Sequence, residues 1–327
     1  MTLIAACLRR LPLLALLTAT VSVRAEDQPL LRPDASIEIP GATGKFDFLE
    51  IDGGRHRLLA AHEKAGTADF FDLQAGKLIT RVETGPAVHI AVDDKDGKYF
   101  VSASDEKKVV VLDSTTLKIT DTIATEGELD AIVYVAKTGK VYVTHDEGSH
   151  VWVIDAASDK IVGTIDVPGI PEYMLYDAVT DRLYLNLKSI NAIIAIDPST
   201  LAVVSRWSTL PAKSPHGLAL DPATGRLFSA GANGVLAAID IKSGQVIGSA
   251  AIAEKVDQNV FDPFTRRIYC ACGSVMSVVQ ETEGGLTALG GVKSEATAKN
   301  VAIDPTTHAV WTTWTDGKNS YAKSWRP

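Results

Sequence analysis

A unit of about 42 residues recurs seven times between Phe46 and the C-terminus of this 327-residue chain. The first turn of each unit is marked, at spacings of 41, 43, 41, 44, 41 and 42, by Asp52, Asp93, Ala136, Asp177, Asp221, Asp262 and Asp304. A second turn is marked, at spacings of 41, 42, 42, 43 and 40, by Asp72, Asp113, Asp155, Asp197, Asp240 and Gln280. Four short apolar segments in about 40–45 residues are typical of one propeller blade. The repeat therefore predicts an all-β fold, a seven-bladed β-propeller of four-stranded blades.

The third unit shows how a blade is expected to form. Its apolar segments at 131–135, 141–144 and 151–155 are rich in β-branched and aromatic residues, which favours strands over helices. Thr138-Gly139, between the first two segments, supplies residues that tolerate the positive φ of a tight turn. A fourth segment at 160–167 completes the blade.

The seventh unit lacks its fourth strand, because the chain ends at Pro327 shortly after a strand near 321–325. A segment near the other end, Ser36–Gly41, resembles the outer strands at 81–85 and 164–169. An N-terminal strand that completes the last blade would close the ring and remove two exposed sheet edges. The sequence predicts this closure.

The first 25 residues have the pattern of a secretory signal peptide. Arg9 and Arg10 precede an apolar run at 11–23, and Val23-Arg24-Ala25 places small residues at the positions that precede cleavage. The run is too short to span a bilayer. The sequence therefore predicts a signal peptide at 1–25 and a propeller domain at 26–327. The mature protein is expected to be periplasmic, with no integral membrane segment after signal cleavage.

The mature chain is acidic. The whole chain has a formal charge of −8, and removal of Arg9, Arg10 and Arg24 changes it to −8 − 3 = −11. A surface of this sign repels a phosphate backbone, so no nucleic-acid partner is expected.

Two cysteines remain after processing, Cys270 and Cys272, at the end of a predicted strand. Residues two apart on a strand point to the same face with Cα atoms about 6.5 Å apart, near the upper limit for a disulfide. The pair could form a strained bridge, contribute to a soft-metal site, or pack between blades as small apolar residues. No Cys-x-x-Cys-His motif occurs, so no covalently attached haem is expected.

Several units resemble those of the YVTN-repeat β-propellers. Tyr142-Val143-Thr144-His145, followed by an apolar strand at 151–155, resembles the Tyr-Val-Thr-Asn repeat of that family, whose bacterial members include YncE-like periplasmic proteins. Weaker copies begin at Tyr99 and Tyr184. The resemblance covers almost all of the mature chain and implies an exported seven-bladed propeller. The family has no shared catalytic motif, so no active site is implied, although related propellers include lactonase-like and quinoprotein dehydrogenase-like enzymes.

Propeller geometry predicts the face on which functional side chains gather. The segment entering each inner strand and the loop between the second and third strands share one face, the channel mouth, whereas the Asp-rich turns lie on the opposite face. The candidate binding residues lie four to six positions before each first-turn marker: Asp47, His89, Asp130, Glu172, Tyr173, His216, Asp257, Lys299 and Asn300. Neighbouring positions add Gln258, His62, Glu63, Asp105, His145 and His150. Polar groups that converge on a concave surface indicate a ligand site.

These side chains leave more than one chemistry open. Histidines and carboxylates could hold a divalent metal, or a histidine could act as a general base with Lys299 steadying an oxyanion. A polar rim would also solvate the funnel of a propeller that binds nothing there. We expect a binding or protein-interaction module that takes a small molecule, a metal or an envelope protein or peptide at the mouth. The alternative is a lactonase-like hydrolase or lyase, and no catalytic residue is assigned.

Overall fold

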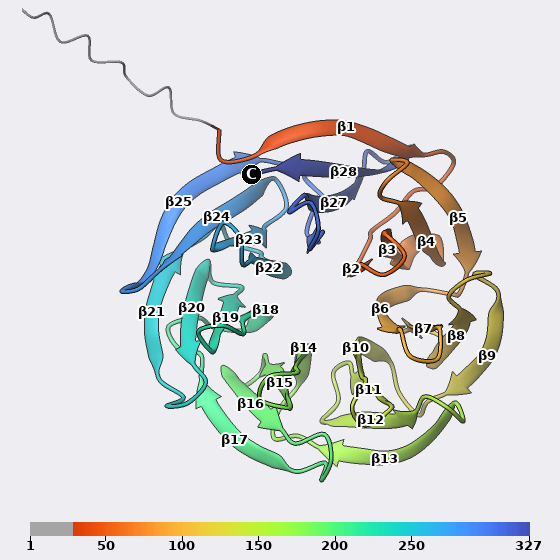
Figure 1. Ribbon diagram of the computed structural model, residues 1–327, viewed down its shortest axis with the longest axis horizontal. Coiled ribbons are helices and arrows are strands. Elements are labelled where there is room, and N and C mark those ends of the chain that lie inside the picture. The colour runs from red at the N-terminus through yellow and green to blue at the C-terminus, as the bar shows by residue number, and fades with distance from the viewer. Residues whose placement is uncertain (1–28) are drawn as a thin grey trace, which may run out of the picture.

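The computed structural model describes residues 29–327, so the predicted signal peptide lies outside the described residues. Within that range the chain forms seven four-stranded antiparallel sheets arranged as a ring around a central axis (Figure 1). Each sheet corresponds to one of the sequence repeats, with one strand of the last sheet supplied from the N-terminal end. The predicted seven-bladed all-β propeller is confirmed.

Strands are numbered in chain order, and the first strand of each repeat lies nearest the axis. Blades 1 to 3 consist of β2 (Leu49–Asp52), β3 (Arg57–His62), β4 (Thr67–Asp72) and β5 (Lys77–Glu83), then β6 (Ala87–Asp93), β7 (Lys98–Ala103), β8 (Lys108–Asp113) and β9 (Ile119–Ala124), then β10 (Leu129–Val135), β11 (Lys140–His145), β12 (His150–Asp155) and β13 (Lys160–Asp166). Blades 4 to 6 consist of β14 (Pro171–Asp177), β15 (Arg182–Leu187), β16 (Ala192–Ile196) and β17 (Val203–Ser208), then β18 (Pro215–Asp221), β19 (Arg226–Gly231), β20 (Val235–Asp240) and β21 (Val246–Ala251), then β22 (Gln258–Asp262), β23 (Arg267–Ala271), β24 (Val275–Thr282) and β25 (Gly285–Lys293). Blade 7 consists of β26 (Ala302–Ile303), β27 (Val310–Thr315), β28 (Ser320–Arg326) and β1 (Arg32–Ile39). The described part of the chain has one helical element, the 3-10 turn η1 (Glu63–Ala65).

The N-terminal strand closes the ring as the sequence predicts. β1 pairs antiparallel with β28, in a register that joins Ile39 to Ser320 at one end and Arg32 to Arg326 at the other. Figure 1 shows β1 on the outer rim beside β28, between β25 and β5. Blade 7 therefore has four strands like the other blades, although its strands come from both ends of the chain.

The repeated aspartates are turn residues, which explains their regular spacing. The side chain of Asp93 accepts hydrogen bonds from the backbone N–H groups of Lys95 and Asp96, and that of Asp113 accepts them from Thr115 and Thr116. A carboxylate that satisfies the N–H groups of the next two or three residues stabilises a tight turn. The most regular residues of the sequence therefore build the face opposite the channel mouth.

The core lies between neighbouring blades. The second and third strands of each blade are almost completely buried, as in β7 and β8, whereas outer strands such as β9 expose most of their residues. Large aromatic side chains fill equivalent places, and Tyr99, Tyr142 and Tyr269 are fully buried. The Tyr142 hydroxyl donates to Pro198 O of the next blade at 2.8 Å, so a buried polar group also joins two blades.

Cys270 and Cys272 are both free and buried. They pack with Phe228 and other apolar side chains between blades 5 and 6. This agrees with the interpretation that the two cysteines pack between blades as small apolar residues. Burial raises the pKa of Cys270 well above its usual value and that of Cys272 to about 11. Both thiols are therefore protonated and unreactive at neutral pH.

Within residues 29–327, no helix has the length and apolar character needed to cross a membrane.

Candidate functional site at the channel mouth

An acidic cleft opens at the channel mouth where blades 1, 2 and 3 meet. Its volume is about 130 Å³. Six carboxylates line it: Asp47, Glu63, Asp105, Glu128, Asp130 and Asp146. One ammonium group, that of Lys45, lines it with them. Asp47 and Asp130 were predicted at the mouth from the sequence, and the cleft brings them together.

Lys45 organises the blade 1 side of the cleft. Its Nζ atom lies 2.8 Å from Asp47 Oδ2 and 2.9 Å from Glu63 Oε2. Burial is the largest of the effects that raise the pKa of Asp47 to about 7. Repulsion from the carboxylates of Asp257 and Glu63 also raises it, and the attraction of Lys45 offsets these effects only in part. This side of the cleft is therefore close to a change of protonation at neutral pH.

Lys188 lies at the next junction, between blades 3 and 4, and reaches the cleft through Asp146. Its Nζ atom lies 2.9 Å from Glu172 Oε2, 3.0 Å from Glu147 Oε1 and 3.4 Å from Asp146 Oδ1. Glu172 is buried, which raises its pKa, whereas the charges of His216 and Lys188 act to lower it. The predicted mouth residues Glu172 and His216 are thus electrostatic neighbours.

Asp130 lies between these two groups. It is only 9% exposed, and its carboxylate makes no hydrogen bond or ion pair with any residue of the range 29–327. Burial raises the pKa of Asp130 well above its usual value, and repulsion from Glu172 and Asp47 raises it further. A buried carboxyl without a partner is costly, so it is a candidate for a functional group.

His89 and Tyr173 lie deeper than this rim. The His89 ring packs against Phe48 and Tyr173, with ring centroids 4.8 and 5.7 Å away, and the side chain is 2% exposed. The Ile132 backbone N–H donates to His89 Nδ1 at 3.2 Å, which leaves the proton of the neutral ring on Nε2. His89 Nε2 lies 3.8 Å from Glu50 Oε2 and has no hydrogen-bond partner. These two predicted residues form the wall of the channel below the mouth.

Gln258 links three inner strands around the axis. Its side-chain carbonyl accepts hydrogen bonds from the N–H groups of Leu49 and Val301 at 3.3 and 3.0 Å, and its amide donates to Leu49 O at 3.1 Å. It therefore joins blade 6 to blades 1 and 7. The sequence placed Gln258 at the mouth but gave no indication of this structural role.

The remaining predicted residues differ in what they do. Asp257 acts on the site through its charge, which raises the pKa of both Asp47 and Glu172. Asn300 is buried, and its carbonyl oxygen accepts hydrogen bonds from Thr313 N and Oγ1 at 2.9 Å each. Lys299 is half-buried, and within the described chain its ammonium group forms no ion pair. Asn300 is thus part of the sheet rather than of the rim.

A serine, a histidine and an aspartate do meet at hydrogen-bond distance, but inside the protein. His62 Nδ1 lies 2.8 Å from Asp69 Oδ2, and His62 Nε2 lies 3.3 Å from Ser320 Oγ. All three side chains are 0% exposed, and Phe46 stacks on the imidazole. The serine cannot meet a substrate, so the trio joins blade 1 to blade 7 and does not form a catalytic site.

A pair of histidines flanks the loop between β11 and β12, since His145 ends the first strand and His150 begins the second. His145 Nδ1 and His150 Nδ1 are 3.4 Å apart, and both rings pack against Trp152. Burial and the neighbouring His145 lower the pKa of His150, so it is neutral at neutral pH. Across residues 29–327, no three His, Cys, Asp or Glu side chains are arranged to hold a metal ion.

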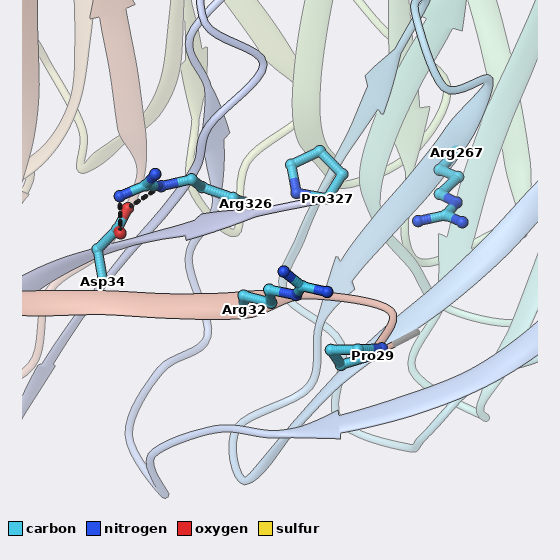
Figure 2. Close-up of a pocket in the computed structure, with 6 residues that line it drawn as sticks. All are labelled: Pro29, Arg32, Asp34, Arg267, Arg326 and Pro327. Atoms are coloured by element: carbon cyan, nitrogen blue, oxygen red, sulfur yellow. Dashed lines mark hydrogen bonds and ion pairs between the residues drawn. The ribbon is translucent and has the colours of Figure 1, made fainter. Parts of the chain in front are cut away.

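A different cavity, of about 630 Å³, lies at the ring closure, away from the mouth. Figure 2 shows that its walls come from both ends of the chain and from Arg267 of blade 6. Asp34 is hydrogen-bonded to Arg326 by two contacts, and Arg267 Nη1 donates to Leu30 O at 3.3 Å. The shape of this cavity follows from the way in which β1 meets β28.

Comparisons with known proteins agree with the fold. Residues 26–182 match the sequence profile of a family described as "Domain of unknown function (DUF5074)". No curated protein matches the chain in sequence.

Solved structures match over most of the chain at low identity. A chain of the Mitotic Checkpoint Complex has a TM-score of 0.78 at 13% identity, covering 98% of this chain and 99% of its own. The structure of the RRP9 WD40 repeats has a TM-score of 0.75 at 9% identity, and the match covers 90% of this chain and 100% of that one. The structure of U3-55K has a TM-score of 0.74 at 9% identity, and the match covers 88% of this chain and 97% of that one. At these identities the likeness shows the seven-bladed propeller fold alone.

Proposed function

We propose that the mature chain is an exported, periplasmic binding module that takes its ligand or partner at the channel mouth. The observation that carries the proposal is Asp130, a buried carboxyl without a partner in a cleft where side chains from three blades meet. Folding alone does not favour such a group, since its desolvation is not repaid by any contact within the described chain. Interaction with a bound group would repay it.

Three further observations support this proposal. The pattern at 1–25 is that of a signal peptide, and the repeats resemble those of exported YVTN and YncE-like propellers. One of the structural relatives is a chain of a protein complex. The hydrolase or lyase alternative gains no such support. Among residues 29–327, two histidines lie within 3 Å of a carboxylate, and both pairs are outside the mouth: His62–Asp69 and His308–Asp262.

A thermal-shift screen of the purified protein 26–327 tests the proposal. The screen covers cationic, anionic and neutral small molecules, divalent ions and short peptides. Ligands that raise the melting temperature should lose that effect in Asp146→Asn and His216→Ala, which alter the mouth. Asp96→Asn, on the exposed turn at the opposite face, is the matched control and should retain it. Hits that persist in both mouth variants would show that the site lies elsewhere.

A further inference from the structure

We propose that the ligand of the mouth is an organic cation, whose ammonium or guanidinium group is received by Asp130 in the acidic cleft between blades 1, 2 and 3. This inference rests on the proposed function and names the chemical class of the ligand. It requires a positive group of small size.

The first argument is the position of the Asp130 carboxylate. The residue is held in place by its backbone, since Ser102 Oγ donates to Asp130 O at 2.8 Å and so ties β10 to blade 2. The residue is nine-tenths buried, its side chain lines the cleft, and its carboxylate has no partner in the described chain. The strand thus presents a fixed, largely buried acceptor to the cleft.

The second argument is the balance of charge in the cleft. Six carboxylates line it against the one ammonium group of Lys45. Lys45 is already engaged by Asp47 and Glu63, and Lys188, at the next junction, is engaged by Glu172, Asp146 and Glu147. Three of the six have no ion pair within 4 Å in residues 29–327: Asp105, Glu128 and Asp130. Asp105 and Glu128 are exposed to solvent, whereas Asp130 is buried, so Asp130 is the carboxylate that most needs a positive partner.

The protein itself shows which group its carboxylates accept. Each of the two lysines places one ammonium between carboxylates of different segments at 2.8 to 3.4 Å. Asp130 lies between these two sites, and a third ammonium or guanidinium there would complete the alternation of charge. Such charge-assisted hydrogen bonds are among the stronger contacts in proteins.

The third argument separates an organic cation from a metal ion. Ca²⁺ takes six to eight oxygen ligands at about 2.3–2.6 Å, and no three acidic, His or Cys side chains of residues 29–327 converge in this way. The cleft of about 130 Å³ is also lined by the buried side chains of Val88 and Leu129. Both side chains are nearly covered, so the surface that the cleft offers to a ligand is almost wholly polar and suits the charged group itself.

Free polyamines and the lysine or arginine side chains of a basic peptide share this chemistry. Isothermal titration of the protein 26–327 with spermidine and with a lysine-rich decapeptide distinguishes these sources. The same titration with a glutamate-rich decapeptide and with CaCl₂ supplies the opposite charge and the metal. We expect saturable binding of at least one organic cation at low ionic strength, weakened in 0.15 M salt because the cleft is open to solvent.

Asp130→Asn is the decisive variant. It removes the charge with little change of volume, so cation affinity should fall by about tenfold or more. The melting temperature of the unliganded variant should equal or exceed that of the wild type, since an unpaired buried charge is lost. Asp121→Asn, on the exposed strand β9, removes an equal charge and should leave cation binding unchanged.

Four results would overturn the inference. Unchanged cation affinity in Asp130→Asn would place the site elsewhere, and saturable Ca²⁺ binding that depends on Asp130 would identify a metal site. If the acidic peptide or a neutral hit binds saturably and this binding is lost in Asp146→Asn, the protein is a binding module whose ligand is not a cation. Absence of any saturable binding across the probes and the thermal-shift screen would contradict both the binding module and the cationic ligand.

Discussion

The Nε2 atom of His62 lies 3.3 Å from the hydroxyl oxygen of Ser320, and this contact joins blade 1 to the blade that contains both ends of the ring. The other ring nitrogen is held by Asp69 at 2.8 Å. Thr67 and Arg81 hold the second oxygen of Asp69 at 2.7 and 3.3 Å. The closure therefore depends on a buried polar network as well as on the β1–β28 ladder.

Replacement of His62 by Ala should destabilise the protein by about 2–3 kcal/mol, because it leaves Asp69 Oδ2 and Ser320 buried with a lost partner. Urea unfolding measures the change. His145→Ala, which alters a partly exposed histidine of blade 3, is the control and should have a smaller effect. An equal loss of stability in the two variants would contradict the role of His62 in the closure.

The same trio should be chemically inert. Diisopropyl fluorophosphate modifies activated serines, but Ser320 is 0% exposed, so we expect no adduct on the native protein by intact-mass spectrometry. Trypsin treated in parallel controls for the reagent. A stoichiometric adduct that maps to Ser320 would mean that the closure opens readily, and it would revive the hydrolase alternative.

Deletion of residues 34–41 should lower the melting temperature and broaden the transition, because it removes most of the strand that completes blade 7. A synthetic peptide of the same residues, added in excess, should restore part of the loss by pairing with β28. A scrambled peptide of the same composition is the control. A truncated protein that melts at the temperature of the full chain would show that the ring does not need this strand.

The stability of the protein should depend on pH through the mouth. The pKa of Asp130 is raised by burial, Glu172, Asp47 and Asp146 and lowered by Lys188, so the folded state binds the proton more tightly than the unfolded chain does. The cost of the buried charge is absent below the unfolded pKa of about 4 and grows as the pH rises. For Asp47, with a folded pKa of about 7, the loss of stability extends from about pH 4 to pH 7.

Urea unfolding of Asp130→Asn and wild type at about pH 4.5, 6 and 7.5 measures this dependence. The variant should gain stability relative to the wild type as the pH rises. Asp121→Asn should differ from the wild type by a constant amount. A constant difference for Asp130→Asn as well would show that Asp130 has the same pKa in both states.

The two thiols should not react with Ellman's reagent in the native protein at pH 7.5, since burial raises the pKa of Cys270 well above its usual value and that of Cys272 to about 11. In guanidinium chloride both thiols of the chain 26–327 should react. One thiol that reacts in the native state would contradict the packing between blades 5 and 6.

The architecture could be predicted because its cause is local. An aspartate at a tight turn bonds the N–H groups of the next few residues, so its chemistry needs no distant partner and recurs with the repeat. The closure was predictable for a related reason, since the strand missing from the seventh unit has a counterpart at Ser36–Gly41. The structure confirms both expectations.

The site was harder to predict because position along a strand does not give the direction of a side chain. Counting from the turn markers found both Asp130 and Asn300, yet one lines the cleft and the other bonds Thr313 within its own sheet. Lys188 was missed because it lies outside the counted positions. Its place next to Glu172 follows from the β14–β15 hairpin, whose register pairs Pro171 with Leu187. Cross-strand register would have revealed that lysine.

The antiparallel pairing of β1 with β28 also decides how the ring would respond to force. Arg32 pairs with Arg326, so the start of β1 and the end of β28 lie side by side at one end of the ladder. The ladder continues from there to the pair Ile39 and Ser320. Tension applied between the ends would load the hydrogen bonds one pair after another, as in opening a zipper, rather than all together in shear. The propeller should therefore open at this seam under a weak pull, even though the same seam completes the ring.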